Sequence, residues 1–208
     1  TGLGHPLTWS EPIQNFDTPP VALGNGYAAV LNGVDERGTA VDVDDLSPGN
    51  AVTDQPWSVM VLVNPTVADR VLLGKFNTAA AQREWLLYYS NPDQVSFLVY
   101  DEGQAFLERA DSPGTPGTPL GSYVLVTGTY DGGGLVGGVR VWFNSTQVDD
   151  ANLSGGVGYV AMHNTLRLVS LGEADGAWFR GRVAFAALVR RDLPQLTLRR
   201  VVTLVNSH

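Results

Sequence analysis

Carboxylates and histidines are the first residues to consider, because a hydrolase needs paired acids or an activated nucleophile at suitable spacing. Asp42 and Asp44 share one face at the end of a predicted strand, which a solvated turn explains. His5, His163 and His208 have no metal-ligand spacing and no Gly-x-Ser-x-Gly segment beside them, so we interpret them as surface or loop residues. We therefore expect that the protein is not an enzyme.

A glycine-rich run from Gly132 to Gly137 has the spacing of a dinucleotide-binding loop. That loop functions only where it opens a helix, whereas the residues from Val139 to Asn144 form a predicted strand. We interpret the run as a hairpin loop and expect no cofactor.

Tryptophans are the residues best suited to binding a ligand, because their flat faces can stack on sugar rings. Trp142 lies opposite the apolar face of its strand, beside Arg140 and near Asn144, and Trp178 lies in a predicted loop. These four residues are the predicted ligand-binding residues. The alternative is that the two tryptophans are packing residues or subunit contacts, as we expect for Trp57 in the core.

Acidic residues at predicted strand ends could supply oxygen ligands to calcium. They are Asp35, Asp131, Asp149, Asp150, Glu173 and Asp175. None of them belongs to a contiguous calcium-binding loop, so we predict solvated acidic loops and no metal site. A structural calcium ion remains the alternative.

Charge and apolar content narrow the possible partners. The formal net charge of -8 would repel a phosphate backbone, so we expect no binding to nucleic acid. No apolar run approaches the roughly 20 residues of a membrane helix, and we expect no membrane insertion. The absence of cysteine leaves the cellular compartment open.

The elements that must position these residues are short apolar runs between Gly, Pro, Asn and Asp, which is the pattern of antiparallel strands. Predicted strands cover Ala28 to Leu31, Thr39 to Val43, Trp57 to Asn64, Arg70 to Lys75, Glu84 to Ser90, Val95 to Tyr100, Ala105 to Arg109, Ser122 to Tyr130, Val139 to Asn144, Thr165 to Leu171 and Phe179 to Val189. Alternate residues of the strands that begin at Ser122 and Val139 should meet in the core. Pro194 and the spacing of the apolar residues after it predict one short C-terminal helix.

Domain organisation follows from the same pattern. Residues 1–25 have weak periodicity and are expected to form an N-terminal arm or edge segment, while residues 26–208 form one sandwich domain. The stretch from Ala110 to Leu120 is rich in Pro and Gly and is interpreted as a loop within that domain.

Several segments, in order, resemble the laminin G-like domains of the concanavalin A-like lectin and glucanase superfamily. They are Leu31 to Asp35, Trp57 to Pro65, Val71 to Lys75 with Trp85 to Tyr89, Tyr123 to Gly132 with Val139 to Ser145, and Phe179 to Val183 with Arg190 to Leu193. The resemblance implies an all-β, two-sheet antiparallel jelly roll. It does not bring over acidic residues, because Val183-Ala184-Phe185-Ala186 stands where many relatives carry two acids. Nor does it bring over the family's calcium site, because Asn144-Ser145 stands in place of the Asp-Gly turn.

The combined prediction is a noncatalytic recognition module that binds a glycan or a protein surface, outside the cell or on a virus particle. The alternative is a structural protein that decorates or cements a larger assembly, such as a phage capsid or tail, and has no small ligand. A hydrolase or lyase with an unrecognised site is a weaker alternative, based on fold analogy alone. The ligand, the host and the oligomeric state do not follow from the sequence.

Overall fold

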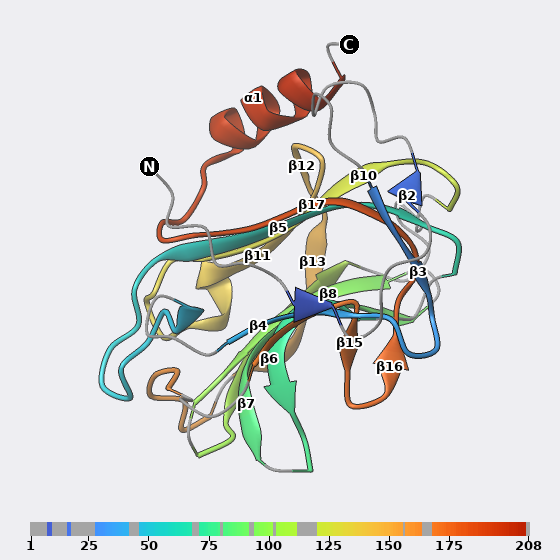
Figure 1. Cartoon of the computed structure of the whole chain (residues 1–208). Helices are drawn as coiled ribbons and strands as arrows, with labels where there is room; N and C mark the ends of the chain where they lie inside the picture. Colours follow the sequence, from blue (N-terminus) through green and yellow to red (C-terminus); the bar gives the residue numbers. More distant parts are fainter. Residues whose placement is uncertain are drawn as a thin grey trace.

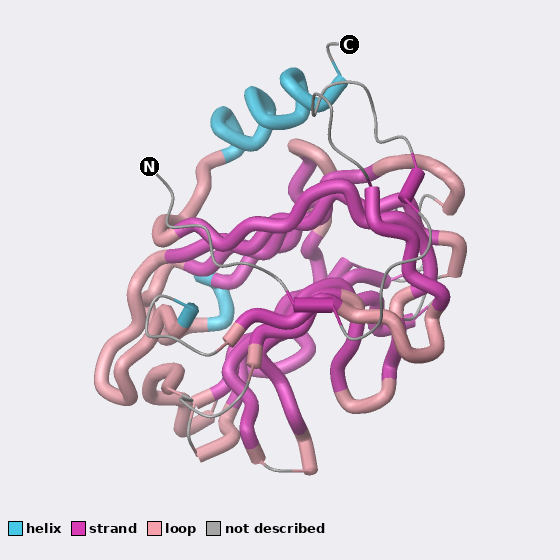
Figure 2. Tube along the Cα trace, viewed as in Figure 1, coloured by secondary structure: helices cyan, strands magenta, loops and turns pink. Residues whose placement is uncertain are grey.

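The computed structural model describes residues 8–9, 16–17, 28–41, 46–67, 71–79, 81–91, 94–101, 103–111, 120–155, 157–163 and 168–206. In these ranges two antiparallel sheets lie face to face, and a helix, α1 (Gln195–Asn206), covers the outer side of one of them (Figure 1 and Figure 2). The predicted all-β sandwich with one short C-terminal helix is confirmed.

The strand order shows how the chain crosses between the sheets. In the described part of the chain, sheet A has the order β1 (Thr8–Trp9), β4 (Gly38–Ala40), β14 (Val169–Leu171), β6 (Val71–Asn77), β7 (Gln82–Asn91), β8 (Gln94–Tyr100), β9 (Phe106–Asp111) and β13 (Asp149–Gly155). Sheet B has the order β12 (Thr146–Gln147), β11 (Val139–Phe143), β10 (Val124–Tyr130), β5 (Trp57–Pro65), β17 (Arg180–Val189), β3 (Ala28–Asn32) and β2 (Phe16–Asp17). Neighbouring strands are often distant in sequence, as expected of a jelly roll.

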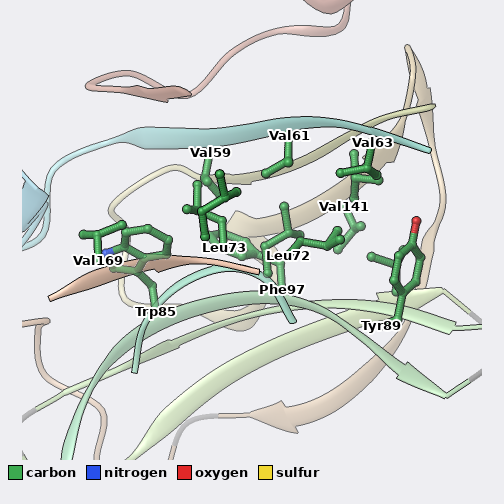
Figure 3. Packing of buried hydrophobic residues seen from close by; sticks show 14 of the residues in the cluster. Val59, Val61, Val63, Leu72, Leu73, Trp85, Tyr89, Phe97, Val141 and Val169 are labelled. Atoms are coloured by element: carbon green, nitrogen blue, oxygen red, sulfur yellow. The ribbon is translucent and has the colours of Figure 1, made fainter. Parts of the chain in front are cut away.

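Strand β5 lies in the middle of sheet B and is buried along its whole length. Val59, Val61 and Val63 point into the core between the sheets, while Met60 and Leu62 point outward into a second apolar cluster beneath α1. Because both faces of the strand are covered, its central residues 59–63 form a continuous apolar run without polar alternation. Figure 3 shows the inward valines packing toward the side chains of sheet A.

The centre of the core is aromatic. Trp57 contacts Trp85 and Phe97 edge-on, with ring centroids 5.1 and 5.3 Å away. Gly128 lies opposite Phe97, where an added Cβ would come within 2.5 Å of the ring. The glycine therefore makes room for the phenylalanine. The apolar faces of β10 and β11 both belong to this core, so their predicted meeting there is confirmed.

Helix α1 begins after Pro194, whose carbonyl oxygen accepts hydrogen bonds from the amides of Thr197 and Leu198 at 2.9 and 3.3 Å. Its apolar residues repeat at intervals of three and four, so Leu198, Val201 and Val202 face the outer side of sheet B. The helix thus converts the outer face of this sheet into a second small core.

Each predicted strand has a counterpart in the structure, with ends shifted by a few residues. The predicted strand from Thr165 begins at Val169 among the described residues, because residues 164–167 lie outside them, as do residues 42–45. The sequence did not predict β12, β13 or the hairpin of β15 (Glu173–Ala174) and β16 (Ala177–Trp178). These strands are short or rich in polar residues, and so lack an apolar pattern.

The described residues of the N-terminal 25 lie at sheet edges. Strand β1 pairs with β4 at the edge of sheet A, and β2 pairs with β3 at the edge of sheet B. Among the described residues, no helix has the length and apolar character that a membrane span requires.

Candidate functional site

A pocket of about 340 Å³ lies at the end of the sandwich where β5 begins and β17 ends. We call it the loop-end pocket. Its walls come from the segment between β4 and β5, the segment after β13, and the residue that follows β17. The lining residues are Ser47, Pro48, Gly49, Asn50, Thr53, Gln55, His163 and Arg190. Its volume is within the range of small-molecule sites.

The wall between β4 and β5 is a tight turn organised by Asn50. The Oδ1 atom of Asn50 accepts hydrogen bonds from the amides of Val52 and Thr53, at 3.0 and 2.8 Å, and from the Thr53 hydroxyl at 3.4 Å. Ala51, inside the turn, has a φ of 65°. The amide of Gln55 closes the segment by donating to the carbonyl of Pro48 at 2.9 Å. The turn therefore holds its shape without a bound partner.

A buried carboxylate, Asp54, joins this wall to the segment after β13. Its Oδ2 atom accepts hydrogen bonds from the hydroxyls of Tyr130 and Tyr159, at 3.0 and 2.6 Å, and its Oδ1 atom accepts one from the amide of Met162 at 2.8 Å. Burial raises the pKa of Asp54, although the three hydrogen bonds act in the opposite direction. Asp54 is thus a structural residue behind the pocket.

Behind Ser47 lies a buried ion pair. Lys75, the only lysine of the chain, contacts Glu84 at 2.7 Å, and both side chains are fully buried. The Ser47 hydroxyl accepts a hydrogen bond from Lys75 at 2.5 Å and donates one to Glu84 at 3.2 Å. A serine beside a lysine can act as a nucleophile only if the amine accepts its proton. Here the ammonium is held by Glu84, so the pair serves as a support for the pocket.

Among the described residues, those that line the loop-end pocket include no carboxylate. What lines it are amides, hydroxyls, one imidazole and one guanidinium, which can bind a polar ligand by hydrogen bonds. The pair of acids that glycoside hydrolysis requires is missing from this lining. The described lining is suited to holding a polar ligand by hydrogen bonds.

The structure places three of the four predicted ligand-binding residues on β11 or in the turn after it. Trp142 points away from the sandwich core, as expected, but Leu193 and Leu198 of the C-terminal segment pack with it and its exposed fraction is 6%. Its indole nitrogen donates to the Thr129 hydroxyl at 3.4 Å. Because α1 covers the ring, no face of it is free for a sugar. The sequence analysis missed this, since the sequence does not reveal where the helix packs. The role of Trp142 in binding remains a prediction that this burial disfavours.

Arg140 and Asn144 have structural contacts. Arg140 pairs with Asp192 at 3.0 Å. Asn144 has a φ of 56° in the turn after β11, where its Oδ1 atom accepts the amide of Leu125 at 3.1 Å. Asparagine is one of the few residues that readily adopt this backbone conformation, which accounts for its position in the turn.

Trp178 lies apart from these three, in the hairpin that contacts β6 of sheet A. The guanidinium of Arg37 lies 5.6 Å from the centre of its ring and also pairs with Glu173 at 2.8 Å. Trp178 is half-buried. The predicted ligand-binding residues therefore do not form one site in this structure.

The outer face of sheet A carries an aromatic cluster that the sequence analysis missed. The Tyr88 hydroxyl donates to Glu108 at 2.7 Å, and Arg83 lies 5.4 Å from the ring centre of Tyr100. Burial raises the pKa of Glu108, which is 7% exposed. These polar groups mainly contact one another, so this face is less suited to a ligand than the loop-end pocket.

Five of the acidic residues considered for calcium have partners within the chain, namely Asp35, Asp131, Asp149, Glu173 and Asp175. Asp149 accepts the amide of Val141 at 2.7 Å and pairs with Arg109 at 2.8 Å, and Asp175 accepts the amide of Thr78 at 3.0 Å. In the described ranges, no three histidine or acidic side chains are grouped closely enough to hold a metal ion.

The residues of the loop-end pocket were not predicted as ligand-binding residues. Asn50 lies 113 positions before His163, and His163 lies 27 positions before Arg190, so no local motif connects them. The Pro-Gly-Asn triplet that begins at Pro48 is a turn signal, and it indicates only that a loop lies there.

Comparisons with known proteins identify relatives of the fold. The sequence matches no family model and no curated protein. The structure is similar to the binding domain of Paraclostridial Mosquitocidal Protein 1, with a TM-score of 0.67 and 8% identity, over 96% of this chain and 47% of that chain. It is similar to the binding domain of Botulinum Neurotoxin serotype G, with a TM-score of 0.63 and 10% identity, over 96% and 47%. The chain thus spans about half the length of these two structures.

A third similar structure is domain 4 of AbnA, a GH43 extracellular arabinanase from Geobacillus stearothermophilus, solved in complex with arabinotriose. The TM-score is 0.53 and the identity 17%, over 96% of this chain and 82% of that chain. At these identities the three comparisons establish a shared β-rich fold.

Proposed function

We propose that this chain is a noncatalytic recognition module, of the laminin G-like type, that binds a glycan outside the cell. The observation that carries the proposal is the loop-end pocket, which offers hydrogen-bonding side chains on a preformed turn and has no carboxylate among its described lining residues. Glycan-binding sites need directional hydrogen bonds to hydroxyl groups, and a rigid wall reduces the entropy cost of binding.

The similar structures support this proposal without establishing it. Two are binding domains of toxins, and the third, the arabinanase domain, was solved with a trisaccharide. A glycan ligand and an extracellular location are therefore consistent with the fold that this chain shares with them.

A glycan array probed with the purified chain, in calcium and again in chelator, tests the proposal. Selective binding in both conditions is expected. Gln55→Trp would place a large side chain at the pocket and should abolish the signal, whereas Gln195→Trp, at the exposed start of α1, should leave it unchanged. A blank array with the unmodified protein would contradict a glycan-binding function, and loss in chelator alone would instead indicate a metal site.

A second candidate function is attachment to a protein surface within a larger assembly. Apolar side chains are exposed on the loops around the same end of the sandwich, namely Val52, Leu135, Val157 and Val160. Exposed apolar residues that cluster can mark a protein-binding surface. Light scattering should then detect a multimer, and Val157→Ser should weaken it; a strict monomer that binds no partner protein would contradict this function.

A further inference from the structure

Positive charge is concentrated in the C-terminal part of this acidic chain. Six of its 13 lysines and arginines follow position 176, whereas all but one of its 21 acidic residues precede it. The one acid after that position, Asp192, is paired with Arg140 at 3.0 Å. In a chain whose net charge is -8, so uneven a distribution indicates a surface for an anionic partner.

Helix α1 carries two of these arginines on its outer side. The helix lies on the outside of sheet B (Figure 1), and Leu198 faces the sheet together with the other apolar residues of the helix that contact it. Residues three and four positions apart are neighbours on a helix, so Leu196 lies beside Arg199 and Arg200. All three side chains are exposed.

The exposed arginines are not engaged by acids of the same chain. In the part of the chain that the structure describes, no ion pair includes Arg191, Arg199 or Arg200. Arg191 is exposed in the segment that leads into the helix. A guanidinium presents several N–H donors in one plane, which matches the oxygens of a phosphate group.

The acids of sheet A lie too far from the helix to cancel this charge. Glu108 belongs to the outer face of sheet A, and Asp175 to the hairpin that contacts the same sheet. Stacked sheets are about 10 Å apart, and α1 lies beyond sheet B. At physiological ionic strength the Debye length is about 8 Å, so these acids are screened from a partner on the helix side.

An exposed leucine among the arginines favours a bilayer over a fully polar polyanion. Leu196 is 62% exposed beside Arg199 and Arg200. The interface of a bilayer offers phosphate groups next to acyl chains, so it can accept both kinds of side chain. A nucleic acid backbone offers the phosphates without an apolar layer behind them.

We propose that the outer side of α1, formed by Leu196, Arg199 and Arg200, attaches the protein peripherally to a bilayer that contains anionic phospholipids. The arginines contact phosphate groups, and Leu196 enters the boundary between headgroups and acyl chains. Sheet B already holds the helix in place, which reduces the entropy cost of binding. None of these residues lines the loop-end pocket, so this inference goes beyond glycan binding.

Sedimentation of the full chain with lipid vesicles tests the proposal. The two vesicle preparations would be phosphatidylcholine alone and a mixture in which about one lipid in three is phosphatidylserine. Binding to the mixed vesicles is expected, with weakening as salt is raised, and no binding to phosphatidylcholine alone. Duplex DNA serves as the polar polyanion for comparison and should bind more weakly than the mixed vesicles.

Variants locate the contact on the helix. Each arginine near an anionic surface contributes about fivefold, so Arg199→Gln with Arg200→Gln should weaken vesicle binding about 25-fold. Arg83→Gln makes one such charge change on the outer face of sheet A and should leave vesicle binding unchanged. Leu196→Ser should weaken vesicle binding about fivefold or more without changing the melting temperature.

The possible outcomes decide between the bilayer and other partners. Equal binding to both vesicle preparations, no binding to either, or full binding by the folded double arginine variant would overturn the proposal. Duplex DNA bound as tightly as the mixed vesicles, or an unchanged affinity in Leu196→Ser, would assign the helix to a polar polyanion instead. Glycan binding on the array should be the same in all these variants, so the two proposals can fail separately.

Discussion

At the scale of single residues, buried carboxylates determine how the loops of this domain are held. Asp54 receives two tyrosine hydroxyls and one backbone amide from different segments. Asp54→Ala would leave these donors unpaired in a buried site and should lower the free energy of unfolding by about 3 kcal/mol. Asp54→Asn, which keeps one acceptor, should cost less than half as much. Urea denaturation measures both, and an alanine variant as stable as the wild type would show that the loops do not depend on Asp54.

A second residue-scale prediction concerns pH. Burial raises the pKa of Glu108 above its ordinary value of 4.5, so the folded state takes up this proton at a higher pH than the unfolded state does. The resulting stabilisation is complete below the unfolded pKa and is lost as pH rises through the folded pKa.

The Glu108→Gln variant lacks this titration and provides the reference. The wild type should gain stability relative to the variant as pH falls from 7 toward about 4.5. Thermal melts at stepped pH would measure the difference, and parallel curves for the two proteins would show that Glu108 does not titrate between these limits.

At the scale of elements, helix α1 stabilises the outer face of sheet B. Leu198 is fully buried there, while Leu196 of the same helix is 62% exposed. Leu198→Ala should lower the free energy of unfolding by about 2–5 kcal/mol through a lost contact and a cavity, and Leu196→Ala by less than about 0.5 kcal/mol. The two changes remove the same atoms, so burial is the variable that separates them.

Tryptophan fluorescence adds an independent measurement, because Trp142 is covered by the C-terminal segment. Leu198→Ala should shift the tryptophan emission toward the red by exposing Trp142, whereas Leu196→Ala should leave the emission unchanged. Equal stabilities and spectra for the two variants would mean that α1 does not pack on the sheet in solution.

At the scale of the whole molecule, we expect the sandwich to fold without a bound calcium ion. Among the acids at strand ends, Asp149 pairs with Arg109 and Asp175 accepts the amide of Thr78. Calcium at millimolar concentration should therefore leave the melting temperature unchanged relative to chelator, because a ligand stabilises a fold only if it binds the folded state. A higher melting temperature in calcium than in chelator would instead indicate the metal site that the sequence left open.

Sequence periodicity determined most of the sandwich, because strand residues alternate between core and surface and turn residues separate the strands. The sequence also predicted Trp57 in the core, the meeting of the apolar faces of β10 and β11 in the core, and the C-terminal helix, all of which are confirmed. Strand β13 lacked this pattern because polar residues dominate it, and two of them, Asp149 and Asp150, were interpreted as acidic loop residues.

Only the tertiary structure decided which side chains meet. The pattern around Trp142 shows that the ring points away from the core, but α1 covers that face, and the docking of a helix depends on residues some fifty positions later. The loop-end pocket brings Asn50, His163 and Arg190 together from three distant segments. Local sequence patterns report the face on which a residue lies; they contain no information about the contacts between elements that create a pocket, since those form only when the whole chain packs.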